Sequence, residues 1–137
     1  MSLVWLIPGK SVRQYDYTPL PQGHSRLLSL HPGQTESPLV AKIFNAQLIE
    51  LRRTPYYGAL SYTWGDPDDA QMLMIGMNPF LMVTPNLRDA LVRLRHTDRP
   101  RTLRIDAVCI NQNDSAEKSR QVVLMTQIYS VADKVLV

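Results

Sequence analysis

Short apolar runs broken by turn residues predict β-strands in the first half of the chain. Two such runs cover residues 25–30 and 46–51. Their apolar positions are Leu27, Leu28 and Leu30 in the first run and Leu48, Ile49 and Leu51 in the second. Proline, glycine and arginine residues follow both runs, which is typical of strands that end in turns. We therefore expect a small N-terminal β layer or hairpin, preceded by a leader over residues 1–24.

From residue 57 onward, the pattern changes to an alternation of strands and helices. Apolar runs predict strands over residues 57–62, 72–75, 80–83, 102–110 and 134–137. A turn from Gly76 to Pro79 separates the second and third runs, so they can pair as a hairpin or lie as two short edge strands. The run that contains Asp106 is expected to be a buried strand whose carboxyl end opens into the loop 111–114.

Two helices are predicted in the same half of the chain. Thr84 before Pro85 indicates a helix start, because the hydroxyl can accept an unpaired amide hydrogen and proline at the first position loses no hydrogen bond. An apolar stripe follows at Leu87, Ala90, Leu91 and Leu94. A second helix is expected to begin near Asp114 or Ser115, with Glu117 in its positive first turn. Its inner face is expected to carry Val122, Met125, Tyr129 and Ala132.

Strands that alternate with helices predict an α/β fold, a parallel sheet flanked by helices. Parallel neighbours need a helix-sized connection, and the spacing of the runs provides one. Ligand sites of such folds lie in the loops at the carboxyl ends of the strands. In this chain those loops are residues 63–66 and 111–114. The last apolar run stops at the end of the sequence, so we expect the domain to be truncated.

Composition and charge indicate one soluble globular domain. Of its 137 residues, 45% are hydrophobic and 20% charged, and the formal net charge is +3. The basic residues are dispersed except for Arg88, Arg93, Arg95, Arg99, Arg101 and Arg104. No aromatic residues interleave with this cluster, which favours a solvated helix surface over a nucleic-acid interface. Because the apolar runs are too short for a membrane span and Cys109 is the only cysteine, we expect a cytoplasmic protein without a membrane partner or a metal.

The acids in the two loop regions are the first candidates for chemistry, and each has a structural alternative. Asp66 precedes a proline and is favoured as a turn residue. A structural and a functional role stay equally open for Asp106, since a carboxylate in an apolar run needs a partner. Asp114 and Glu117 are explained most simply as residues of a helix start.

The remaining candidates are aromatic, amide and thiol side chains. Trp64 can stack on a base or fill the core, and both interpretations stay open. Asn111 and Gln112 can bind a ligand or satisfy backbone groups of their own loop. Cys109 is favoured as a small buried thiol, because no histidine lies in a motif with it.

Four blocks carry a family resemblance when they are taken in order. They are Ala59–Asp66, Thr84–Leu94, Ile105–Gln112 and a helix that carries Glu117, Gln121, Val122, Met125, Ile128, Tyr129 and Ala132. Together they resemble the fungal heterokaryon-incompatibility (HET) domain over roughly residues 25–137. One departure is Arg104, where the family usually carries tryptophan before the isoleucine–aspartate pair, which calls a local packing contact of the family into question.

The resemblance implies a module for fungal non-self recognition that triggers programmed cell death. It implies a fold similar to the Toll/interleukin-receptor (TIR) fold, with self-association or another signalling domain as the partner. Some TIR domains cleave nicotinamide from NAD with a glutamate after the third main strand, a region that would lie beyond Val137. The alternative is therefore a TIR-like hydrolase with NAD as substrate, and whether the chain is an enzyme stays open. Candidate ligand or signature residues are Ser61, Tyr62, Trp64, Gly65, Asp66, Asp106, Asn111, Gln112 and Glu117.

Overall fold

The computed structural model describes residues 4–7, 10–47, 58–60, 71–77, 79–131 and 134–136. Its strands are β1 (Val4–Ile7), β2 (Lys10–Gln14), β3 (His24–Leu30), β4 (Val40–Gln47), β5 (Gly58–Leu60), β6 (Gln71–Ile75), β7 (Pro79–Val83), β8 (Arg101–Ile105) and β9 (Lys134–Leu136). Its helices are α2 (Pro85–Leu94), α3 (Asp106–Cys109) and α4 (Ser115–Val131). None of the helices in these ranges combines the length and the apolar character that crossing a membrane requires.

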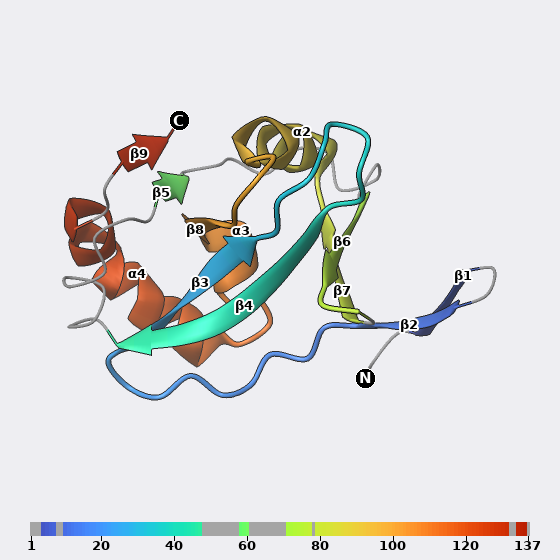
Figure 1. Ribbon diagram of the computed structural model, residues 1–137. Helices are drawn as coiled ribbons and strands as arrows, with labels where there is room; N and C mark the ends of the chain where they lie inside the picture. The colour runs from blue at the N-terminus through green and yellow to red at the C-terminus, as the bar shows by residue number, and fades with distance from the viewer. Residues whose placement is uncertain are drawn as a thin grey trace.

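The strands form one mixed sheet in the order β1-β2-β7-β6-β4-β3-β8-β5-β9 (Figure 1). Parallel pairing joins β8, β5 and β9, as expected for strands connected through helices. The longest ladder, between β3 and β4, is antiparallel, and so are the β6–β7 and β3–β8 ladders. The prediction of an α/β fold is confirmed, but the prediction of a parallel sheet is wrong. The connections from β3 to β4 and from β6 to β7 are too short to provide the crossover that parallel neighbours need. These two strand pairs therefore form antiparallel hairpins.

The two strands expected at 25–30 and 46–51, which are β3 and β4 in the structure, lie at the centre of the sheet and not in a small layer of their own. β3 pairs with β4 on one side and with β8 on the other (Figure 1). The predicted hairpin is therefore confirmed, and the predicted separate β layer is wrong. β4 spans Val40–Gln47, whereas a strand was expected at 46–51, whose last four residues lie outside the described ranges. Residues 41–47 pair with 24–30 of β3, and this pairing decides the position of the strand.

The apolar core lies between one face of the sheet and the helices α2 and α3. It brings together Leu28, Leu30, Leu39, Ala41, Leu73, Ile75, Leu81, Val83, Leu87, Leu91, Leu103, Ile105, Val108 and Cys109. The helix start at Thr84 is confirmed, since its Oγ1 accepts a hydrogen bond from the Leu87 amide at 3.3 Å. The buried residues Leu87 and Leu91 belong to the stripe expected for α2.

The strand predicted over residues 102–110 ends earlier than expected, before Asp106. β8 stops at Ile105, and Asp106–Cys109 form the single turn α3, closed by a hydrogen bond from the Ile110 amide to the Asp106 carbonyl. The continuous apolar run 107–110 was the reason to expect a strand. A helical turn buries Val108 and Cys109 in the same core, so the apolar pattern alone does not separate the two conformations.

Helix α4 turns a polar face toward the body of the protein over its first two turns. Glu117 and Gln121 are buried there, whereas Val122, expected on the inner face, is 53% exposed. The side chains of Met125 and Tyr129 and all of Ala132 lie outside the described part of the chain. Residues four apart lie on the same side of a helix, so Glu117 and Gln121 meet the body together. The prediction for Val122 is wrong because this helix buries polar partners.

Candidate functional site

The candidate site lies where β5 and β8 end side by side. The two strands are parallel, with Gly58 opposite Leu103 and Leu60 opposite Ile105, so both run out at the same edge of the sheet. Asp106 follows directly at that edge. This arrangement confirms that the chain leaves β5 and β8 at neighbouring points. The candidates Ser61, Tyr62, Trp64, Gly65 and Asp66 follow β5 and lie outside the described residues.

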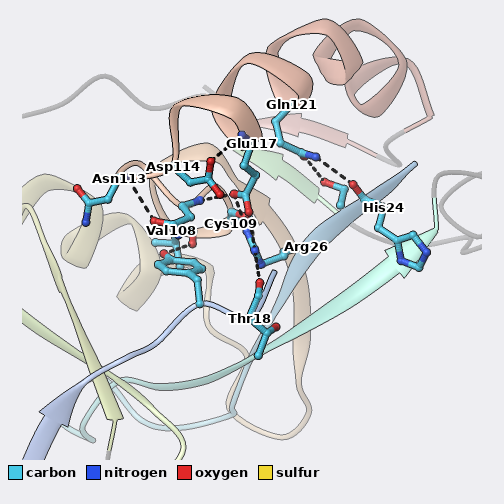
Figure 2. Close-up of polar contacts among 12 residues, drawn as sticks. Thr18, His24, Arg26, Val108, Cys109, Asn113, Asp114, Glu117 and Gln121 are labelled. Carbon is cyan, nitrogen blue, oxygen red and sulfur yellow. Dashed lines mark hydrogen bonds and ion pairs between the residues drawn. The ribbon is translucent and has the colours of Figure 1, made fainter. Parts of the chain in front are cut away.

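A buried ion pair between Arg26 and Glu117 is the main feature of the described part of this site (Figure 2). Arg26 Nη2 lies 2.7 Å from Glu117 Oε1, and Arg26 Nη1 lies 2.7 Å from Glu117 Oε2. Both side chains are 1% exposed. The two parallel contacts match the planar fork of a guanidinium to a carboxylate, which is the strongest geometry such a pair can adopt. Glu117 is therefore more than a first-turn helix carboxylate.

Arg26 also holds three further groups around the pair. Its Nη2 donates to the Thr18 carbonyl at 2.7 Å and its Nη1 to the Cys109 carbonyl at 3.1 Å. The ring of Tyr17 lies against its guanidinium, 4.9 Å from the ring centroid to Cζ. These contacts compensate for the loss of water around a buried cation. Arg26 thus joins β3 to the segment before it, to α3 and to α4.

The loop 111–114 is built by its own side chains and by Glu117. The Asn111 amide donates to Glu117 Oε2 at 2.6 Å, and Asn111 Oδ1 accepts from the Asn113 amide at 3.2 Å. Asp114 Oδ1 accepts from the Glu117 amide at 3.1 Å, which confirms a helix start at Asp114 (Figure 2). Gln112 Nε2 donates to the Asp106 carbonyl at 3.0 Å. The Asn111 side chain therefore satisfies a backbone group of this loop, and the Gln112 side chain satisfies one of α3.

A second buried cation, Arg104, lies on β8 and contacts α4. Its side chain is 0% exposed, and its Nη2 donates to Gln121 Oε1 at 3.2 Å. Asp106 Oδ1 lies 3.6 Å from the same Nη2, and the Asp106 side chain is 26% exposed. Gln121 also accepts from Ser25 Oγ at 2.9 Å and donates to the His24 carbonyl at 2.9 Å. Asp106 is thus placed beside an arginine, a partner of the kind that a carboxylate in an apolar run needs.

Helix α4 contacts both faces of the sheet at the beginning of β3. Neighbouring residues of a strand point to opposite faces, so Ser25 and Arg26 leave β3 on opposite sides. Gln121 meets Ser25 and Glu117 meets Arg26. The helix is therefore fixed to the sheet by polar contacts on both sides of one strand.

A solvated helix surface was predicted for the arginine cluster of residues 88–104, and this prediction is wrong. Arg95 and Arg104 are buried, whereas the Arg99 side chain is 67% exposed. Arg95 donates to the carbonyls of Ser37 at 3.1 Å, of Pro38 at 2.9 Å and of Gln34, and so holds the turn between β3 and β4. Arg95 and Arg104 are therefore buried hydrogen-bond donors and not part of a solvated surface.

Two side chains with reactive groups lie near the ion pair, the half-buried Tyr17 and the buried Cys109. Burial raises the pKa of the Tyr17 hydroxyl well above its ordinary range, and this hydroxyl donates to the Val108 carbonyl at 2.5 Å. Cys109 is buried, as predicted for a small core thiol. Within the described ranges, no three His, Cys, Asp or Glu side chains gather in a way that could hold a metal ion.

Arg26 and Tyr17 were not among the residues singled out from the sequence, and Gln121 was named only as part of the family resemblance. Arg26 precedes two leucines in a predicted strand, and an arginine in such a run is a signal that could have raised the question of a buried partner. Nothing local in the sequence identifies Glu117 as that partner. The two residues are 91 positions apart.

Comparison with known proteins assigns the chain to a family. The model of the family described as "Heterokaryon incompatibility protein (HET)" matches residues 57–137, which include β5, β8, α3 and α4. The chain belongs to the heterokaryon-incompatibility family. It is similar to "Heterokaryon incompatibility protein 6, OR allele" of the fungus Neurospora crassa, with 38% identity over 130 residues, 85% of this chain and 19% of that protein. The chain thus spans about a fifth of the length of that relative. No solved structure matches it, so a TIR-like fold stays a prediction.

Proposed function

We propose that this chain is a signalling module of fungal heterokaryon incompatibility, which turns non-self recognition into programmed cell death through self-association. Membership of the family supports the general role. The geometry of Glu117 supports a structural role for this carboxylate and not a catalytic one. This carboxylate accepts three hydrogen bonds, from both terminal nitrogens of Arg26 and from the Asn111 amide, and is 1% exposed. A carboxylate held in this way organises the loop and offers no free oxygen pair to a substrate.

The proposal is tested by inducible expression of the full chain in a filamentous fungus and by sedimentation velocity of the purified chain. We expect growth arrest and dye uptake after induction, together with reversible self-association over a micromolar concentration range. The variant Glu117→Ala should lose both properties. A matched control is Lys118→Ala, which changes an exposed neighbour on the same helix and should keep both. Growth without arrest, or a monomer at all concentrations, would contradict the proposal.

The same purified chain distinguishes the signalling role from that of a TIR-like NAD hydrolase. Incubation with NAD and chromatographic measurement of nicotinamide release should show no turnover above a buffer blank. Turnover that saturates with NAD and is lost on substitution of Asp106, the acid at the end of β8, would replace the signalling proposal with the enzymatic one.

A further inference from the structure

The segment of residues 15–20, here called the strap, crosses the protein between β2 and β3 without regular secondary structure. It is nevertheless attached along its length. The Tyr15 amide donates to the Phe80 carbonyl at 2.7 Å, and the Tyr17 hydroxyl donates to the Val108 carbonyl at 2.5 Å. Tyr15 and Tyr17 also contact each other edge to face at 5.0 Å, and Leu20 is buried. An irregular segment with these contacts is a docked element of the fold.

A continuous series of polar contacts leads from the strap to the loop 111–114. The Thr18 carbonyl and Glu117 Oε1 share Arg26 Nη2, each at 2.7 Å. The other carboxylate oxygen, Oε2, accepts from Arg26 Nη1 and from the Asn111 amide. The guanidinium is a rigid plane, so a shift of one nitrogen moves the other. Figure 2 shows this series from Thr18 through Arg26 and Glu117 toward the loop.

We propose that the strap controls the order of the loop 111–114 through the Arg26–Glu117 pair. With the strap docked, the Tyr17 ring and the Thr18 carbonyl fix the guanidinium, and the guanidinium fixes the carboxylate that holds the Asn111 amide. With the strap displaced, water reaches Arg26, the pair weakens and the loop loses its acceptor. The β1–β2 hairpin precedes the strap directly and projects from the body of the protein (Figure 1). A partner that binds this hairpin can therefore change the loop without touching it.

This coupling rests on the contacts alone and holds whether the module signals or hydrolyses NAD. Hydrogen exchange of single amides, measured by NMR on the full chain, tests it at Asn111. Tyr17→Leu removes the hydroxyl and the aromatic face but changes no group in contact with the Asn111 amide. We expect exchange of this amide to rise about tenfold, the factor that corresponds to about 1.4 kcal/mol of local stability. Amides of β6 and β7 should keep their protection.

Two control variants separate coupling from general destabilisation. Tyr15→Phe keeps the backbone bond to Phe80 and the ring contact, and should leave the Asn111 amide unchanged. Leu91→Ala, in the core contributed by α2, should raise exchange of all slowly exchanging amides together. If Tyr17→Leu does not fold, Tyr17→Phe loses only the bond to Val108 and takes its place, with a smaller rise expected at Asn111. The coupling would be overturned if the Asn111 amide stayed protected while the amides of the strap exchanged freely. It would also be overturned if hydrogen exchange rose equally at Asn111 and at the amides of β6 and β7.

Discussion

Replacing Glu117 by glutamine should cost this protein a large part of its stability, although the side chain keeps its length. The substitution removes the negative charge and leaves the Arg26 guanidinium, 1% exposed, without the carboxylate 2.7 Å away. Breaking one partner of a buried pair costs about 3–5 kcal/mol, because the remaining charge is neither hydrated nor paired. Whole domains have a free energy of unfolding of about 5–15 kcal/mol. For a chain of this size, we expect a Tm about 10–20 °C lower.

Urea unfolding followed by circular dichroism measures this loss directly. The exposed pair Arg99–Asp98, with 3.8 Å between its charged atoms and side chains 67% and 74% exposed, gives a matched comparison. Asp98→Asn should change the free energy of unfolding by less than about 1 kcal/mol. In a double-mutant cycle, Arg26→Met together with Glu117→Gln should cost clearly less than the two single changes added. Additive losses, or a Glu117→Gln cost below about 1 kcal/mol, would refute the buried-pair reasoning.

Three further predictions concern other parts of the fold. Gly33→Ala should destabilise the protein by about 1–3 kcal/mol in urea unfolding, because the new Cβ would lie 3.0 Å from Nη1 of the Arg95 guanidinium, which three carbonyls hold in place. Thr84→Ala should cost about 1 kcal/mol by removing the acceptor of the Leu87 amide, and Thr84→Ser should restore most of it. Burial raises the folded-state pKa of Tyr17, so its contribution is complete below about pH 10 and is lost as the pH rises further. Urea midpoints measured between about pH 9 and 11 should therefore fall less steeply for Tyr17→Phe than for the unchanged chain.

Features specified by neighbouring residues could be predicted from the sequence. The start of α2 at Thr84 and that of α4 at Asp114 depend on hydrogen bonds to amides three residues away, which any reader of the sequence can anticipate. The β6–β7 hairpin is closed by Gly76, whose φ of +87° favours glycine. The neighbouring ends of β5 and β8 followed from the length of their connection.

Features specified by distant residues could not be predicted in this way. Periodicity assigns charged positions to the surface, whereas Arg26, Arg104 and Glu117 are buried because each has a partner elsewhere in the fold. The central position of β3 depends on its pairing with β8, which lies some 70 residues later. The same limitation applies to the candidate site. Glu117 was selected for its place in a motif, and its actual partner, Arg26, lies outside residues 57–137 that the family model matches.

Because 91 residues separate Arg26 from Glu117, the pair cannot form during synthesis until long after Arg26 has been added to the chain. At about 5–20 residues per second, a ribosome needs about 5–20 s to synthesise that interval. During this time the guanidinium has no carboxylate, and one edge of β3 has no strand until β8 emerges. Contacts between such distant positions slow folding, since a long loop must close before they form. The β3–β4 hairpin therefore has an unpaired edge for seconds during synthesis, an interval in which a chaperone can protect it from aggregation.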